Sequence, residues 1–239
     1  YAIWVGMGVA GIVSLLEKLV KKNNAILASL VAIICLGVPF QMVGQTWDDH
    51  DRSNRYTTRD FGRNYLSSLE ENAIIFTNGD NDTFPLWYAQ EVEGIRTDVR
   101  IINSSLASTD WYIDQMKQKF YESDPVPVSI ERKQYLYGTN DYVPVIDAFG
   151  QPILASDAIS VFRNPKYVPK GGSDYIPAKK VIIKVNRENA LASGIVKPEN
   201  AHLIQDSLVI DIKPEHLTKF NLSIRDILSN YDWSRPFCF

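Results

Sequence analysis

Residues 73–103, AIIFTNGDNDTFPLWYAQEVEGIRTDVRIIN, hold two short apolar runs separated by a helical pattern. The runs at 73–77 and 99–103 are rich in β-branched residues, as buried strands are. Between them Thr83 can cap a helix, and Pro85 stands close to its first turn, where a missing N–H costs little. With a further helix after it, this order is a βαβα unit whose strands should be parallel neighbours joined by a right-handed crossover. The sequence therefore predicts an α/β domain with a parallel or mixed sheet.

Helical patterns flank this unit on both sides. Residues 52–71 carry aromatic and aliphatic residues at helical spacing among charged ones, which predicts an amphipathic helix. On the other side, Thr109 and Asp110 can cap a helix from Trp111 to Tyr121.

The stretch 126–177 shows no strong helix and is rich in Tyr, Pro and Gly. A stretch of this length without elements is unusual in a compact domain, so it is either a functional loop region or a set of short strands. We favour irregular structure packed by five aromatic residues, Tyr135, Tyr137, Tyr142, Phe162 and Tyr167.

Regular structure is expected again towards the end of the chain. Residues 180–185 and 207–212 are alternating or β-branched, which predicts two strands. Short helices are expected near 214–220 and 223–231.

The beginning of the chain has the composition of membrane-spanning helices. Residues 25–43 contain no charge over 19 positions, and a bilayer core needs about 20 such residues. The alternative, a buried helix of a soluble protein, would usually be shorter and show a polar face. Residues 1–16 are also uncharged and contain Gly6, Gly8 and Gly11, small residues that let membrane helices approach closely. We interpret 1–16 as the remainder of a second membrane helix.

The charges around these helices predict their orientation. Lys18, Lys21 and Lys22 lie between the two apolar runs, whereas Asp48, Asp49 and Asp51 follow the second. By the positive-inside rule the lysines face the cytoplasm. We therefore expect transmembrane helices with a short cytoplasmic loop in 1–44 and an extracytoplasmic domain in 45–239, which in a bacterial inner membrane is periplasmic.

Composition excludes several functional classes. The net charge of −3 leaves no basic patch for nucleic acid. Cys35 and Cys238 are too differently placed to suggest a disulfide, and the scattered histidines show no zinc-binding spacing. Nucleophile elbows, P-loops and the dinucleotide fingerprint are absent from the sequence.

The stretch 77–85 is the best candidate for a ligand site. It joins the carboxyl end of a predicted parallel strand to a helix, and ligands of open α/β sheets bind in that crevice. Its carboxylates, amides and hydroxyls could hold a divalent cation or the hydroxyls of a sugar, although tight turns and helix caps require the same residue types. We expect Asp80 or Asp82 to point into a crevice shared with Asn103. The candidate ligand-binding residues are Asn78, Asp80, Asn81, Asp82, Thr83 and Asn103.

A second acidic cluster, residues 48–52, follows the apolar run. We favour a helix N-terminus here, because carboxylates interact well with that end of the helix dipole. Catalysis by paired carboxylates at the membrane surface is the alternative.

Several strings carry a resemblance to a known family. These are WDDHDRSNRY at 47–56, RDF at 59–61, NYL at 64–66, NGDNDTFPLWY at 78–88, VEGIR at 92–96 and WSRPF at 233–237. Together they resemble the membrane-protein family of unknown function 2723, which is glycosyltransferase family 117-like and similar to the transmembrane O-mannosyltransferases. The resemblance covers nearly the whole chain.

The resemblance implies that the chain holds the last membrane helices and the outer domain of a polytopic membrane glycosyltransferase-like protein. The implied partners are the lipid bilayer, a lipid-linked sugar and a protein acceptor. Catalytic acidic residues are expected in an early outer loop of such transferases, outside this chain, so no catalytic residue can be assigned here. The outer domain would then support acceptor binding or assembly. A non-catalytic, membrane-tethered binding or assembly module is the alternative.

Overall fold

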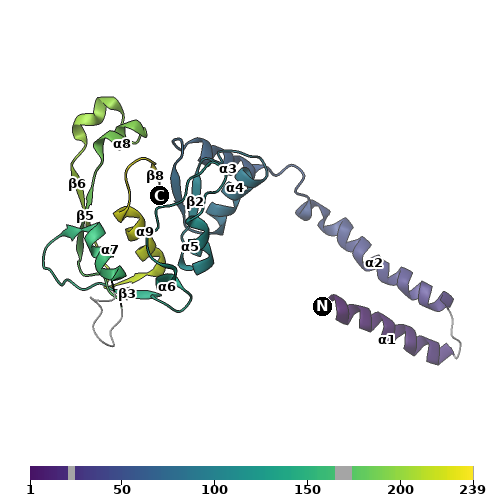
Figure 1. The fold of residues 1–239 in the computed structure, drawn as a ribbon. Coiled ribbons are helices and arrows are strands. Elements are labelled where there is room, and N and C mark those ends of the chain that lie inside the picture. Colours follow the sequence, from purple (N-terminus) through teal and green to yellow (C-terminus); the bar gives the residue numbers. More distant parts are fainter. Residues whose placement is uncertain (21–24, 165–173, 239) are drawn as a thin grey trace. The chain divides into compact units, whose positions relative to one another are not determined.

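The computed structural model describes residues 1–20, 25–164 and 174–238, and it forms two compact units, Tyr1–Tyr56 and Thr57–Phe239 (Figure 1). Lys21, Lys22 and Tyr167, which entered the expectations above, lie outside the described residues.

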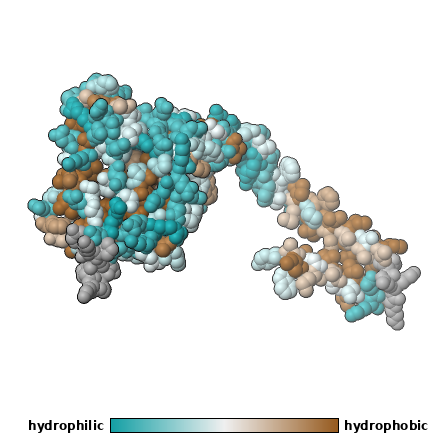
Figure 2. Space-filling model, viewed as in Figure 1, coloured by the Kyte–Doolittle hydropathy of each residue, from teal (hydrophilic) through white to brown (hydrophobic). Residues whose placement is uncertain are grey.

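The first unit consists of two helices, α1 (Ala2–Val20) and α2 (Ala25–His50). Both are long and apolar enough to cross a membrane. Their large apolar side chains are exposed, which suits contact with lipid, and Figure 2 shows brown apolar residues spread among paler ones on both helices. The expectation of two apolar N-terminal helices is confirmed.

Helix α2 continues past the predicted end at residue 43 and includes Asp48 and Asp49 in its last turn. The next helix, α3, begins only at Thr57. Our interpretation of the acidic cluster as a helix N-terminus is therefore wrong, because these carboxylates lie at the end of α2 where the helix dipole is unfavourable to them. Asp51 follows α2 and accepts a hydrogen bond from the Ser53 backbone N–H at 2.9 Å.

The sheet that positions the candidate site contains three parallel strands in the order β2-β1-β8. β1 (Ile74–Thr77) pairs with β2 (Arg100–Asn103), in a register that places Ile75 opposite Ile101. The predicted parallel pair is confirmed. On the other side of β1 lies β8 (Phe237–Cys238), whose two residues are too few to show a period in the sequence.

Successive residues of a strand point to opposite faces of the sheet. Both faces of this sheet carry buried side chains, and helices cover both of them. On one face, Ile75 packs in a core cluster with Leu66 of α3 (Thr57–Ser67) and Leu86 of α4 (Asp80–Glu91). On the other, Ile74 and Phe76 join a larger cluster to which α5 (Asp110–Met116) and α9 (Lys219–Ser229) contribute. The α/β class is thereby confirmed.

Helix boundaries in the second unit also differ from the predicted ones: α3 covers Thr57–Ser67 instead of 52–71. α4 begins at Asp80 with Gly79 as its N-cap residue, so Thr83 lies inside the helix and does not cap it. α5 ends at Met116 instead of Tyr121, because Phe120 and Ser123 form a β-bridge that turns the chain away.

The remainder of the second unit contains two small sheets and several short helices. β3 (Tyr142–Pro144) pairs antiparallel with β7 (His216–Thr218). β5 (Lys180–Lys184) and β6 (Ser207–Asp211) confirm the two predicted strands and form a mixed sheet in the order β4-β5-β6. The other elements are η1 (Leu106–Ser108), α6 (Arg132–Tyr135), β4 (Ile153–Leu154), α7 (Ala155–Arg163), α8 (Arg187–Ala192) and η3 (Pro198–Leu203).

The expectation of irregular structure over 126–177 is wrong where α7 forms. This helix buries Phe162 in the core, and Tyr135 is buried as expected. Tyr137 and Tyr142 are exposed and do not pack the region. Near the end of the chain, β7 stands where a helix was expected near 214–220, whereas the helix expected near 223–231 is present as α9, which begins earlier, at Lys219.

Helices α3 and α4 touch through their backbones at Gly62. A Cβ atom added to Gly62 would lie 2.3 Å from the Pro85 carbonyl oxygen and 2.8 Å from its carbonyl carbon. Both are backbone atoms, so neither can move aside cheaply. The glycine is needed here for close approach.

We expect Gly62→Ala to destabilise the second unit by about 1–3 kcal/mol, the usual cost of overpacking, although alanine favours the helix by about 1 kcal/mol. Thermal unfolding of the detergent-solubilised chain, followed by near-UV circular dichroism, would measure the loss. Asn64→Ala, at an exposed position of the same helix, is the matched control and should change stability little. Equal midpoints for the two variants would contradict this account of the contact.

Candidate functional site at the carboxyl edge of the parallel strands

The carboxyl ends of β1 and β2 lie side by side, because Thr77 is paired with Asn103 in the register of the two strands. The Ser104 backbone N–H continues the ladder and donates to the Thr77 carbonyl at 2.8 Å. The loops that follow both strands therefore emerge at one edge of the sheet, as the sequence predicts.

A buried network of side chains joins the two strand ends to α4. Thr83 Oγ1 lies 2.7 Å from the Gly79 carbonyl and donates to it. Its lone pairs then accept from Thr77 Oγ1 at 2.7 Å and from Asn103 Nδ2 at 2.8 Å. All three side chains are almost fully buried. Each hydrogen bond therefore gives a partner to a polar group that would otherwise destabilise the fold.

Asn103 also connects the edge to α5. Its Oδ1 accepts from the Leu106 backbone N–H at 2.9 Å, and its own backbone N–H donates to Tyr112 Oη at 3.0 Å. Tyr112 Oη in turn donates to the Ile101 carbonyl at 3.3 Å. Burial raises the pKa of Tyr112, so the phenol stays protonated and able to donate. The phenol thus supplies hydrogen-bond partners for the Asn103 N–H and the Ile101 carbonyl at the outer edge of β2, where a further strand could otherwise pair.

The structure brings together only some of the predicted site residues. Thr83 and Asn103 are in direct contact inside the network. Asp80, Asn81 and Asp82 are exposed on the first turn of α4. The side chain that reaches Asn103 is thus Thr83, and the expectation that a carboxylate shares a crevice with Asn103 is wrong.

Asn78 links the exposed residues to the end of β2. Its side-chain oxygen accepts from Ser104 Oγ at 3.0 Å, and its backbone carbonyl accepts from the same hydroxyl at 3.1 Å. We call the exposed group of Asn78, Asp80, Asn81 and Asp82 the polar edge. Its carboxylates lie at the favourable end of the α4 dipole. Within the described residues, no group of three or more His, Cys, Asp or Glu side chains is arranged to hold a metal ion.

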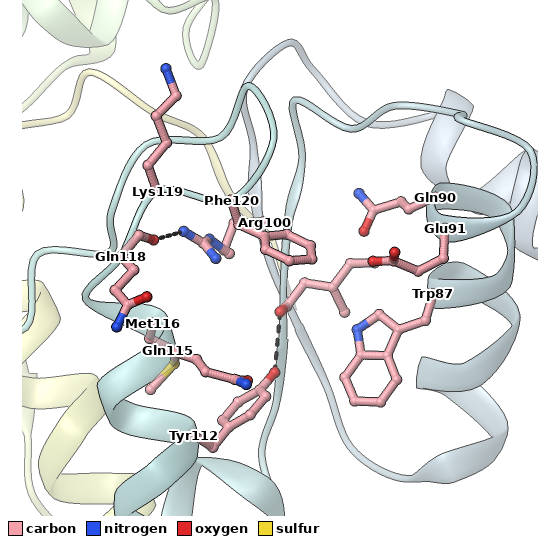
Figure 3. A pocket seen from close by; sticks show the side chains of 11 residues that line it. Trp87, Gln90, Glu91, Arg100, Tyr112, Gln115, Met116, Gln118, Lys119 and Phe120 are labelled. Carbon is pink, nitrogen blue, oxygen red and sulfur yellow. Dashed lines mark hydrogen bonds between the residues drawn. The ribbon is translucent and has the colours of Figure 1, made fainter.

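A cleft of about 430 Å³ runs along β2 between α4 and α5 (Figure 3). Trp87, Gln90 and Glu91 line it from α4, and Tyr112 lines it from α5. Tyr112 therefore belongs both to the cleft and to the hydrogen bonds that close the outer edge of β2. The other lining residues are Arg100, Ile101, Gln115, Met116, Gln118, Lys119 and Phe120.

Arg100 is a buried cation beside this cleft. Its guanidinium donates to the Gln118 carbonyl and, at 3.3 Å, to the Asp124 carbonyl, and no described residue accepts from its Nε. Burial, together with the nearby charge of Arg235, lowers the pKa of Arg100 to about 10, so it stays protonated at neutral pH. Arg235 donates to the same Asp124 carbonyl at 3.0 Å. The two arginines hold the segment that follows α5 in place.

Sequence reasoning missed Tyr112 and Arg100 as parts of the site. Tyr112 carried only the signal of an aromatic residue in a predicted helix, and Arg100 stands alone in an apolar run. An arginine inside an otherwise apolar strand is the one available hint that a buried polar contact exists there.

We expect Thr83→Val to destabilise the second unit by about 1–3 kcal/mol, because Thr77 and Asn103 would keep buried polar groups without a partner. Valine has nearly the shape of threonine, so packing is preserved. Thr83→Ser keeps the hydroxyl and is the matched control; it should recover most of the loss. Thermal unfolding of the solubilised chain measures both variants, and equal losses for Val and Ser would show that the hydroxyl network is not what stabilises the edge.

Comparisons with known proteins place this chain among relatives of sugar transferases. It is 23% identical over 124 residues to the protein O-mannosyl-transferase tmem260 of Dictyostelium discoideum, covering 46% of this chain and 15% of that protein. It is 27% identical over 115 residues to the mouse protein O-mannosyl-transferase TMEM260, covering 48% of this chain and 16% of that protein. The chain therefore spans a small part of the length of these relatives. No solved structure matches.

The family model TMEM260-associated domain 2 matches residues 58–239, which is nearly the whole second unit. This match and the two relatives support the implied relation to O-mannosyltransferases. The chain belongs to the family defined by TMEM260-associated domain 2.

Proposed function

We propose that the second unit binds the protein acceptor of a glycosyl transfer whose catalytic residues lie outside this chain. The chain is related to membrane glycosyltransferases, and its two apolar helices indicate a membrane protein. In the proposed reaction a lipid-linked sugar is the donor. The narrower assignment to the family of unknown function 2723 and to glycosyltransferase family 117 belongs to the same proposal.

The observation that carries this proposal is the rigid presentation of the polar edge. The buried contacts of Thr83 and Asn103 fix the first turn of α4, while Asp80 and Asp82 stay exposed. Carboxylates and amides that stand in fixed positions suit a polypeptide acceptor, because they can accept hydrogen bonds from its backbone N–H groups and hydroxyls without rearranging. The polar edge also lies at the carboxyl ends of parallel strands, the end at which α/β sheets bind their ligands.

The proposal includes an orientation in the membrane. Lys18 in the last turn of α1 carries positive charge, as do Lys21 and Lys22 after it in the sequence, and acidic residues stand at the end of α2 and just after it. By the positive-inside rule, the second unit then lies on the extracytoplasmic side, the periplasm in a bacterial inner membrane. A lipid-linked sugar on that side of the membrane would be available as the donor to the protein that contains this unit.

The test of acceptor binding uses the double variant Asp80→Asn, Asp82→Asn in the full-length protein. Asparagine keeps the size of the side chains but removes both charges, so the fold should survive. We expect KM for the acceptor to rise about tenfold, equivalent to about 1.4 kcal/mol, with kcat little changed, since an interaction that only holds the acceptor acts on binding. Transfer to a defined acceptor domain at several acceptor concentrations gives both constants.

The matched control is Asp157→Asn, which removes an exposed carboxylate from the first turn of α7, away from the polar edge. It should leave KM unchanged. Equal constants for the double variant and the control would contradict acceptor binding at the polar edge. If transfer is normal but the double variant no longer associates with a partner protein, the unit is a non-catalytic assembly module.

The orientation has its own test. Reporter fusions after Lys22 and after Asp60 should report opposite sides of the membrane, with the second outside, because α2 lies between them. Alkaline phosphatase is active only outside the cytoplasm, and green fluorescent protein is a suitable inside reporter. Cytoplasmic signals from both fusions would refute the proposed orientation.

A further inference from the structure

A second cleft, of about 510 Å³, lies between the start of α5, the chain after α6, strand β3 and the start of α9. It shares no residue with the polar edge. Three of its lining residues are aromatic and strongly exposed: Tyr137 at 93%, Tyr142 at 73% and Trp111 at 49%. Tyr137 and Tyr142 lie five positions apart in the segment that runs from α6 into β3, and Trp111 comes from the separate helix α5. Aromatic side chains usually bury a large apolar area in the core. Three solvent-exposed aromatic rings around one cleft are therefore typical of a binding surface.

We infer that this aromatic cleft binds a neutral carbohydrate of one or two pyranose rings. A sugar ring has an apolar face of C–H groups, which stacks on aromatic rings, and a rim of hydroxyls, which needs both donors and acceptors. The volume lies within the range of small-ligand sites. The inference concerns a site other than the polar edge and holds whether or not the polar edge binds an acceptor.

The polar groups of the cleft supply both kinds of hydrogen bond. Lys219 is buried, and its Nζ donates to the Leu136 carbonyl at 2.9 Å and to Asp141 Oδ1 at 2.8 Å, which engages two of its three protons. The other carboxylate oxygen of Asp141 is available as an acceptor, because that side chain is 53% exposed. Thr218 Oγ1 accepts from Asn221, so its own proton can be donated to a ligand.

The charges of the cleft favour a neutral ligand over an anionic one. Asp110 and Asp141 contribute two negative charges and Lys219 one positive, so the lining carries a net charge of −1. Asp141 already compensates Lys219 at 2.8 Å. A phosphate or sulfate group would therefore meet net negative charge from the described lining residues, and the cation among them, Lys219, is already paired with Asp141.

An extended peptide is disfavoured by the surroundings of β3. One edge of β3 is paired with β7, and on the other side the Ile176 backbone N–H donates to the Pro144 carbonyl at 2.9 Å. The outer edge is thus occupied at the Pro144 carbonyl, and proline has no N–H to donate, so an added peptide strand could pair with little more than Tyr142. The available contacts are aromatic faces and side-chain polar groups, which a carbohydrate uses.

The experiment measures saccharide binding to the whole chain in lipid nanodiscs by saturation-transfer difference NMR. The probes are mono-, di- and trisaccharides of mannose, glucose, galactose and N-acetylglucosamine. At least one neutral saccharide should bind with a dissociation constant of about 1 mM or tighter. Trp111→Ala and Tyr142→Ala should each weaken that binding about five- to tenfold, the loss of one aromatic stacking contact.

Two further variants separate the aromatic cleft from general effects. Trp111→Phe keeps an aromatic face and should bind within about threefold of the unaltered chain. Phe149→Ala removes an exposed aromatic side chain that does not line the cleft, and it should bind normally. Circular dichroism checks that each variant folds, and Asp80→Asn with Asp82→Asn should bind saccharide normally.

Several results would overturn the inference. One is the absence of saccharide binding at about 50 mM, far above a weak dissociation constant. Another is binding that neither Trp111→Ala nor Tyr142→Ala weakens. A third is preference for inorganic phosphate or a sugar phosphate over the neutral sugar, and a fourth is Trp111-dependent binding of unglycosylated peptides without binding of saccharides.

Discussion

The hydroxyl of Thr83 is the point at which the sheet and its helices are fixed to one another. It binds the end of β1 through Thr77, the end of β2 through Asn103, and the preceding turn through the Gly79 carbonyl. Asn103 then orients Tyr112 and through it α5. Because every member is buried, the loss of one hydrogen bond leaves the others with unmet partners. The exposed polar residues owe their fixed positions to this small interior network.

The fold class could be read from the sequence because the two central strands are apolar on both faces and separated by a clear helical pattern. The short elements could not be predicted from the sequence. β8 contributes two residues, and its pairing with β1 depends on contacts more than 150 positions apart, such as the hydrogen bond from Arg235 Nε to the Asn72 carbonyl at 2.9 Å. α7 was missed because its apolar face is short and lies inside a stretch rich in turn-forming residues.

The candidate site was predictable in place but not in detail. Its location at the ends of two parallel strands follows from chain order alone. Which side chains turn inward does not follow from chain order. Asp80, Asp82 and Thr83 are close in sequence, and the start of α4 at Asp80 decides that Thr83 faces the sheet while the carboxylates face solvent. Burying a hydroxyl with three partners costs far less than burying a carboxylate, which explains the choice. The aromatic cleft is assembled from distant segments, so no local pattern announced it.

The late position of β8 has a consequence for synthesis of the protein. As the chain leaves the ribosome, β1 and β2 emerge long before residues 235–238, and β1 meanwhile keeps one side unpaired. An open, apolar strand edge is a template for wrong pairing with other chains. Domains whose closing contacts are this distant in sequence fold slowly and stay exposed for longer. Until residues 235–238 are made, the nascent chain would therefore depend on chaperones to cover the open edge of β1.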